Sequence, residues 1–181
     1  MKVLPTTLPE VLVIEPQVFT DDRGCFFESF NRRSFAFATG IDVDFVQDNH
    51  SQSGGGVLRG LHYQLRQPQG KLVHVIQGAI FDVVVDIRRS SPNFGRWVGV
   101  ELTSENRKHL WAPPGFAHGF LALSETAEVF YKVTDYYAPD DERCIRWDDP
   151  DLGIQWPYVA SMTISKKDRE APGLSFCEIS S

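Results

Sequence analysis

The feature that most constrains this 181-residue chain is a series of short apolar runs between residues 71 and 133. Each run is rich in β-branched and aromatic residues, and Gly, Pro, Asn and Ser separate one run from the next. The runs occupy residues 72–76, 80–87, 97–102, 109–112, 119–123 and 127–133. Regular spacing of this kind, with hardly any helical periodicity, predicts an antiparallel β-sandwich or β-barrel. The length fits a single domain over residues 1–181.

The N-terminal part of the chain predicts two more strands and one helix. Strands are expected at residues 11–14 and 25–30, with a turn over residues 19–24, where Asp and Gly are frequent. Residues 31–39 are expected to form the one convincing helix. Asn31 can cap its first turn and Gly40 can end it.

The remaining segments are expected to be loops or turns. Residues 51–56 are polar and glycine-rich, which indicates a flexible connection. We interpret LRGLHYQ at 58–64 as a glycine-flanked turn that presents Arg59 and His62. Residues 148–181 contain three prolines and are expected to wrap the barrel as a tail.

Charge and composition exclude several classes of protein. The net charge of −6 argues against a nucleic-acid binder, which would need a basic face. No run of 18 apolar residues exists, so no membrane association is expected. The first residues lack a secretory signal, and three cysteines without paired spacing suit a reducing compartment, so we expect a cytoplasmic protein with free thiols. A pocket for a small anion would have to gather Arg and Lys locally.

Strand alternation places two polar side chains among valines. Lys71 shares a strand face with Val73 and Val75, and Tyr131 shares one with the valines at 129 and 133. Each has a simpler interpretation: Lys71 can reach solvent from a strand end, and Tyr131 can fill the core. His50, His74 and His109 have no obvious partners, so structural or surface roles are expected for them. His62 and His118 are each expected to follow a glycine-containing turn and are the candidates for a site.

The pattern around these histidines resembles that of the cupins, whose barrels hold a metal, but the metal ligands are incomplete. PxGxxH at 113–118 fits the second cupin motif. In the first motif Gln64 stands where a second His would be, and residues 66–78 contain no Glu. One certain ligand cannot hold Zn²⁺ or Fe²⁺, so we predict a site without metal.

Taken together, the motifs resemble those of the dTDP-4-dehydrorhamnose 3,5-epimerase family of nucleotide-sugar enzymes. The resemblance runs from about residue 19 to about residue 168 and includes RGLHYQ at 59–64, GK at 70–71, SPNFGxW at 91–97, PGFAHGF at 114–120, YKVTDYY at 131–137, IxWP at 154–157 and SKKD at 165–168. It implies an all-β fold, a cupin-type antiparallel jelly-roll barrel with short peripheral helices.

The resemblance also implies roles for individual residues. His62 would be the general base, oriented by Asp168, with Tyr131 as the acid on the opposite face of the sugar and Lys71, helped by Arg59, stabilising an enolate. The other substrate-contacting positions would be Phe19, Arg23, Glu28, Gln47, Asp48, Asn49, His118, Tyr137, Glu142 and Lys167. In the family Phe19, Arg23 and Glu28 come from the neighbouring subunit, which implies a homodimer with exchanged N-terminal strands.

Elementary chemistry agrees with this assignment. Protons at C3 and C5 of a 4-keto-6-deoxy sugar flank the ketone, so each can leave to give an enolate. A neutral imidazole titrates near working pH and suits their removal. The sequence contains neither a dinucleotide fingerprint nor a P-loop, and no cofactor is expected.

Three rival functions remain at this point. A mono-epimerase acting at C3 or C5 alone, on a related dTDP-4-keto-6-deoxy sugar, would need the same base and acid. A cupin-like sugar-binding protein without turnover would not need the set His62, Asp168 and Tyr131. A metal-dependent cupin oxygenase or isomerase is opposed by Gln64 and the missing Glu.

Overall fold

The computed structural model describes residues 1–179. Its elements are β1 (Lys2–Pro5), β2 (Leu12–Glu15), β3 (Val18–Asp21), β4 (Gly24–Phe27), α1 (Arg32–Thr39), β5 (Gln47–Gly54), β6 (Val57–Gln64), β7 (Lys71–Gln77), β8 (Ala79–Asp86), β9 (Trp97–Thr103), β10 (His109–Ala112), β11 (Phe116–Ala122), β12 (Thr126–Val133), the 3₁₀ turn η1 (Pro139–Asp141), β13 (Glu142–Cys144), β14 (Thr163–Ile164), α2 (Lys166–Arg169) and the 3₁₀ turn η2 (Leu174–Phe176).

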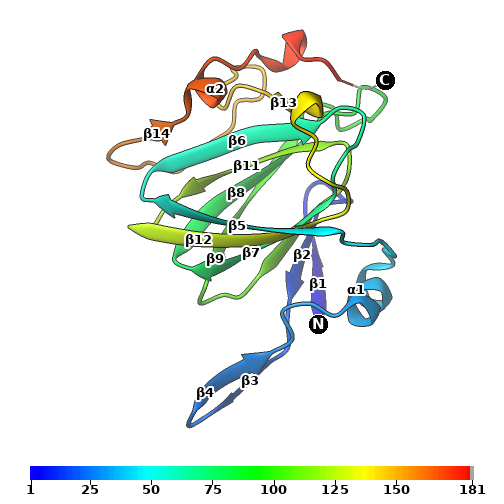
Figure 1. Ribbon diagram of the computed structural model, residues 1–181, viewed down its shortest axis with the longest axis vertical. Coiled ribbons are helices and arrows are strands. Elements are labelled where there is room, and N and C mark those ends of the chain that lie inside the picture. Colours follow the sequence, from blue (N-terminus) through cyan, green and yellow to red (C-terminus); the bar gives the residue numbers. More distant parts are fainter. Residues whose placement is uncertain (180–181) are drawn as a thin grey trace.

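Two antiparallel sheets face each other and form a jelly-roll barrel (Figure 1). One sheet has the strand order β1-β2-β10-β7-β12-β5, and the other has the order β13-β6-β11-β8-β9. The short strand β14 adds to β6 in parallel. The all-β prediction is therefore confirmed, and neither helix in the described part of the chain is long and apolar enough to cross a bilayer.

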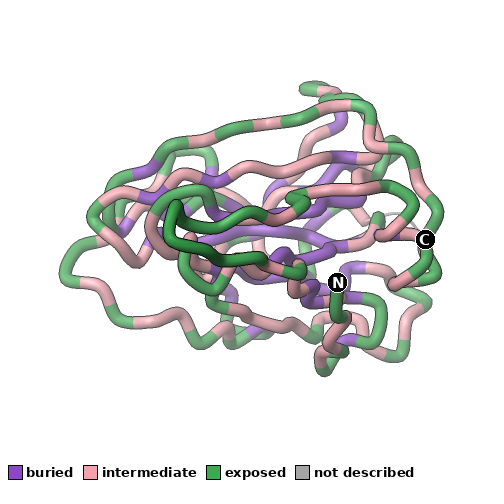
Figure 2. Tube along the Cα trace, turned by 90° about the horizontal axis from the view of Figure 1, so that it is seen from below, coloured by how far each residue is buried: buried purple, intermediate pink, exposed green. Residues whose placement is uncertain are grey.

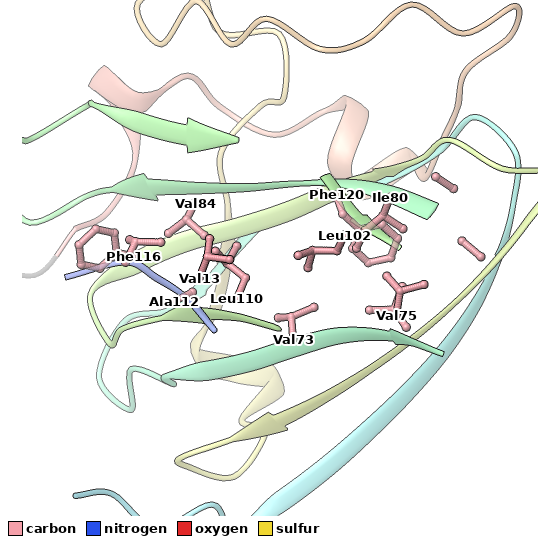
Figure 3. Close-up of a cluster of buried hydrophobic side chains, with 14 of the residues drawn as sticks. Val13, Val73, Val75, Ile80, Val84, Leu102, Leu110, Ala112, Phe116 and Phe120 are labelled. Atoms are coloured by element: carbon pink, nitrogen blue, oxygen red, sulfur yellow. The ribbon is translucent and has the colours of Figure 1, made fainter. Parts of the chain in front are cut away.

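The core lies between the sheets, as strand alternation requires. Val73 and Val75 of β7 pack against Ile80, Val84 and Phe120 from the opposite sheet, and all are buried (Figure 3). Burial follows the central strands, whereas the exposed residues lie mainly in loops and at the edges (Figure 2). The side chains of alternate residues therefore form one apolar interior.

Helix α1 begins and ends where the sequence predicts. The side chain of Asn31 accepts a hydrogen bond from the Ser34 amide at 3.1 Å, and Gly40 adopts the left-handed conformation that ends the helix. The helix buries Phe35 against Trp111 and Phe45 on the outer face of the β7 sheet.

Three local predictions are wrong. Residues 51–54 continue strand β5 instead of forming a loop, and residues 57–64 form strand β6 instead of a turn. The turn expected over residues 19–24 is shorter, because β3 extends to Asp21 and β4 begins at Gly24. The β3–β4 hairpin projects away from the barrel (Figure 1). β5 was missed because its sequence, QDNHSQSG, contains no apolar side chain.

The C-terminal tail covers the outer face of β6 and its neighbours. β14 pairs with β6, and Leu152 and Leu174 join the apolar cluster outside that sheet. Helix α2 lies against β6 (Figure 1). The tail thereby brings Asp168 next to the middle of β6.

Candidate active site

A cavity of about 360 Å³ opens between the two sheets. It is lined by Gln47, Asn49, Ser51, Arg59, His62, Gln69, Lys71, His118, Gly119, Phe120, Tyr131, Tyr137 and Glu142. The polar side chains come from both sheets, so groups on opposite walls can act on the two faces of one bound molecule.

His62 on β6 forms a hydrogen-bonded pair with Asp168 on α2. The distance from His62 Nε2 to Asp168 Oδ1 is 2.7 Å, and the Gly60 amide donates to the other carboxylate oxygen at 3.3 Å. Burial by itself would raise the pKa of Asp168, but the hydrogen bond and charge of His62, with the Gly60 amide, outweigh it and lower that pKa. The carboxylate is thus held ionised behind a ring that is 28% exposed toward the cavity.

Two glycines allow the backbones of β6 and β11 to approach closely beside His62. A Cβ atom on Gly60 would lie 2.5 Å from the Gly119 Cα, and one on Gly119 would lie 2.6 Å from the Arg59 carbonyl oxygen. Gly60 also has a φ of 120°, which L side chains rarely adopt. Regular alternation is broken at this point, and both Arg59 and His62 reach the cavity although three positions separate them.

Lys71 at the start of β7 is a buried cation. Its Nζ approaches the His62 carbonyl oxygen at 3.5 Å. Burial lowers the pKa of Lys71 to about 8, although the negative charges of Glu142 and Asp82 oppose the shift. At pH 7 an amine with this pKa is about nine-tenths protonated, so the cavity contains a poorly solvated ammonium group.

Tyr131 lies on β12, in the sheet opposite His62. It pairs with Asn49 on one side and Val73 on the other, and it packs against the apolar core. Burial raises the pKa of its hydroxyl, and the positive charge of Arg59 opposes that shift. The hydroxyl is therefore protonated at neutral pH and available as a proton donor.

His118 on β11 has a carboxylate partner that the sequence analysis missed. Its Nε2 lies 2.8 and 3.0 Å from the two oxygens of Asp82, which is fully buried. His118 is the third residue of strand β11, which begins at Phe116 directly after the predicted glycine-containing turn at residues 114–115. A signal was present, because Asp82 alternates with Ile80 and Val84 on the inner face of β8.

A polar network closes the rim of the cavity. Tyr137 donates to Glu142 at 2.9 Å, Lys167 also binds Glu142, and the Tyr137 amide donates to the Gln47 side chain at 3.1 Å. Burial would raise the pKa of Glu142, but the hydrogen bonds from Lys167 and Tyr137 lower it overall. Lys167 is thus near the cavity through Glu142 without lining it.

Four of the predicted contact residues lie elsewhere in the structure. Phe19 and Arg23 are exposed on the projecting β3–β4 hairpin, and Glu28 follows the hairpin and accepts from Asn31. Asp48 points to the other face of β5 and forms an ion pair with Lys132 at 2.7 Å. Conversely, Ser51, Gln69, Gly119 and Phe120 line the cavity without having been predicted.

Gln64 does not replace a metal ligand. Its amide nitrogen donates to the carbonyl oxygens of Gln67 and Tyr136, and its amide oxygen accepts from the Ala138 backbone. All its strong hydrogen-bonding atoms therefore hold neighbouring loops, and it does not line the cavity.

Both the sequence and the structure are similar to those of known nucleotide-sugar epimerases. Residues 5–175 match the family model described as dTDP-4-dehydrorhamnose 3,5-epimerase. The enzyme of that name from Pseudomonas aeruginosa is 58% identical over 170 residues, which cover 94% of each chain. The structure is also similar to the Legionella pneumophila dTDP-6-deoxy-D-glucose-3,5-epimerase in complex with dTDP-4-keto-L-rhamnose, with a TM-score of 0.96, 49% identity and coverage of 98% of this chain and 94% of the other. A 3'-monoepimerase from Streptomyces bikiniensis in complex with dTDP-quinovose gives a TM-score of 0.89 at 37% identity, over 97% of this chain and 88% of the other.

Proposed function

This chain belongs to the dTDP-4-dehydrorhamnose 3,5-epimerase family, and from that premise we propose that it inverts C3 and C5 of dTDP-4-dehydro-6-deoxy-D-glucose. The product is dTDP-4-dehydro-L-rhamnose, and the enzyme is an isomerase. The observation that carries the assignment is the His62–Asp168 pair in a cavity that also contains the Lys71 ammonium, with Tyr131 on the opposite wall.

The reaction starts with loss of a proton next to the C4 ketone. The neutral imidazole of His62 removes it, and the Asp168 carboxylate stabilises the imidazolium that forms. Negative charge then develops on the ketone oxygen. Lys71 stabilises this enolate, with an effect of roughly 3–4 kcal/mol if it resembles the loss of one oxyanion donor. Arg59 on β6 adds a second positive charge to the cavity from the opposite sheet.

Inversion requires the new proton to arrive on the other face of the sugar. Tyr131 is suited to this step because it lies on the opposite sheet and its hydroxyl holds a proton at neutral pH. Arg59, Gln47, Asn49, His118, Tyr137, Glu142 and Lys167 would bind the sugar and the nucleotide diphosphate.

A mono-epimerase remains the second candidate, because the structural likeness extends to one. The identity of 58% to a 3,5-epimerase against 37% to the 3'-monoepimerase favours double inversion. Both functions need the same base and acid, so the two carbons must be examined separately.

The test is incubation with dTDP-4-keto-6-deoxy-glucose in D₂O, with NMR reading label and configuration at C3 and C5. The wild type should take up deuterium and invert at both carbons. Tyr131→Phe keeps the ring and removes only the hydroxyl, so exchange should continue at one carbon at least while net inversion falls by roughly 10²-fold. Label at one carbon only would identify a mono-epimerase, and no label at all would indicate a binding protein. Full inversion at normal rates in Tyr131→Phe would mean that another group is the acid.

We further propose that the enzyme is a homodimer in which the N-terminal strands are exchanged. Phe19 and Phe26 are 57% and 69% exposed on a hairpin that leaves the barrel (Figure 1). Apolar side chains presented in this way suit a protein partner. In a dimer, Phe19, Arg23 and Glu28 of one subunit would complete the site of the other. Light scattering measures the oligomeric state of the wild type and of the double variant Phe19→Ser Phe26→Ser directly.

The domain organisation and the cellular location are proposed from the same family membership. We propose that residues 1–181 form one jelly-roll domain with a wrapping tail that begins at residue 148; residues 180 and 181 lie outside the described part of the chain. The free thiols at Cys25, Cys144 and Cys177 support a cytoplasmic location.

A further inference from the structure

A third side chain adjoins the His62–Asp168 pair and takes no part in the proposed reaction. Cys144 on β13 is the direct cross-strand neighbour of His62 on β6, so both side chains are on one face. Its Sγ lies 3.6 Å from Asp168 Oδ1. One potential ligand atom from each of His62, Cys144 and Asp168 lies within 4.8 Å of the others, the one such group found in residues 1–179.

We propose that His62, Cys144 and Asp168 form an inhibitory binding site for a thiophilic divalent cation such as Zn²⁺. An imidazole nitrogen, a thiolate sulfur and a carboxylate oxygen each bind zinc, and three protein ligands leave the fourth tetrahedral position open. From zinc–ligand bonds of about 2.0–2.3 Å, two tetrahedral ligand atoms lie ~3.3–3.6 Å apart. The Sγ–Oδ1 distance of 3.6 Å already fits, and the His62–Asp168 distance of 2.7 Å must open by about 0.6 Å.

The surroundings allow an ion to enter and to exchange. His62 lines the main cavity, and a second hollow of about 350 Å³ reaches His62 and Asp168 from the side of β14. The His62 ring is 28% exposed, which leaves it room to turn. The thiolate selects soft ions, because Mg²⁺ and Ca²⁺ prefer sites made of oxygen ligands.

An ion in this site would block turnover. It would bind His62 Nε2, the nitrogen that faces Asp168, so that the neutral ring carries its one proton on Nδ1 and has no lone pair left to accept the substrate proton. It would also draw Asp168 away from the imidazole. The ion therefore differs from a cupin metal: removing it raises activity. The inhibition rests on the proposed role of His62 as the base, whereas the binding of the ion does not.

The binding experiment uses the full chain with Cys25→Ser as background, which removes the exposed thiol. Cd²⁺ is the probe, because a cadmium–thiolate bond gives an ultraviolet charge-transfer band. We expect one saturable band per chain. Cys144→Ser keeps a hydrogen-bond donor for Asp168 but removes the thiolate, so the band should disappear. Cys177→Ser removes the other buried thiol and should leave the band intact.

The activity experiment measures deuterium exchange with and without Zn²⁺, each variant being compared with its own chelated sample. Zn²⁺ should inhibit the background protein and Cys177→Ser alike, and a chelator should reverse the inhibition. In Cys144→Ser the half-inhibitory concentration should rise by at least about 100-fold, more than the loss of a ligand's hydrogen-bonding partner usually causes.

The two experiments fail in different ways. Absence of the Cd²⁺ band, or a band that survives in Cys144→Ser, would overturn the metal site whatever the enzyme does. A band lost in Cys144→Ser without Zn²⁺ inhibition of the background protein would overturn the inhibitory role alone. The exchange rate of His62→Asn, measured separately, tests whether His62 is the base.

Discussion

Two pairs of histidines lie on different sheets of the barrel. One pair faces the interior and the other faces outward, and their surroundings differ. On the inner side His62 and His118 each contact a buried carboxylate, at 2.7 and 2.8 Å. On the outer face of the other sheet His74 and His109 contact each other, with ring centroids 4.6 Å apart and planes at 13°. Neither outer ring has a carboxylate partner within residues 1–179, and His109 Nε2 makes no hydrogen bond there.

In the outer pair His109 is buried and His74 is partly buried, and no carboxylate partner in the described part of the chain would balance a positive charge on either ring. Burial, and then the positive charge of Lys132, lowers the pKa of His74 to about 4. Burial, and then His74 itself, lowers the pKa of His109 to about 3. The inner pair shows what a partner adds: a carboxylate such as Asp168 can balance an imidazolium, which is what a base needs after it accepts a proton. The same residue type is thus a catalytic candidate in one place and a neutral packing group in the other.

The largest expected effect is on catalytic activity, which should depend on the inner histidine pair and not on the outer one. His62→Asn should lower hydrogen–deuterium exchange at C3 and C5 by up to about 10⁴-fold, the upper range of what a positioned base contributes. His74→Asn, the matched change on the outer face, should leave the exchange rate essentially unchanged. NMR in D₂O measures both. If the His62 variant keeps most of its exchange, another residue is the base.

The next effect concerns the outer pair and the free energy of unfolding. Unfolded histidine has a pKa near 6.5, so between that value and about 4 the unfolded chain binds more protons than the folded one. Stability therefore falls as pH falls through this window. From pH 7 to pH 5 the loss is about 2 kcal/mol for each ring, or roughly 4 kcal/mol together.

Urea unfolding at the two pH values measures this loss, and His74→Phe His109→Phe is the control. Phenylalanine keeps a flat ring in each position but does not titrate. The double variant should keep most of the stability that the wild type loses at pH 5. An equal loss in both proteins would mean that other groups cause the acid sensitivity.

A smaller effect is expected when the inner pair loses its carboxylate. Asp168→Asn leaves the imidazole in place but removes the charge that supports its protonated form. Exchange should fall by roughly 10²-fold, the lower end for general-base catalysis. Exchange rates at saturating substrate measure the change. A loss as large as that of His62→Asn would indicate that Asp168 is essential for orienting the ring or itself takes the proton.

The sequence predicts the inner side of the barrel well where alternation is regular. The valine register around Lys71 and Tyr131 correctly places both side chains toward the interior, because β7 and β12 pair in regular register over residues 71–75 and 129–133. The capped helix at Asn31 is also correct, because capping depends on local contacts alone.

Prediction from the sequence fails for two strands, β5 and β6, whose sequences lack the usual pattern of a strand. β5 is entirely polar because alternate residues such as Gln47, Asn49 and Ser51 face a polar cavity, which removes the apolar signal of a strand. β6 resembles a turn because of Gly60, which serves the close approach to Gly119. The partner of His118, Asp82, could be found from its inward register on β8, but its pairing depends on which strands become neighbours.

The smallest expected effect concerns Lys71. Like the inner histidines it is buried near carboxylates, but like the outer ones it has no direct carboxylate contact among the described residues, since its Nζ approaches a carbonyl oxygen. Its pKa of about 8 predicts that kcat/KM falls as pH rises through that value, because the neutral amine no longer stabilises an enolate. Among the neighbouring charges, that of Glu142 opposes the lowering of the Lys71 pKa most strongly.

Glu142→Gln removes that negative charge. The ammonium form of Lys71 is then less favoured, so the alkaline limb of the pH profile should move to lower pH by less than about one unit. Glu128→Gln, which changes a carboxylate paired with His50, should leave the limb in place. A limb that does not move in Glu142→Gln would show that a group other than Lys71 sets it.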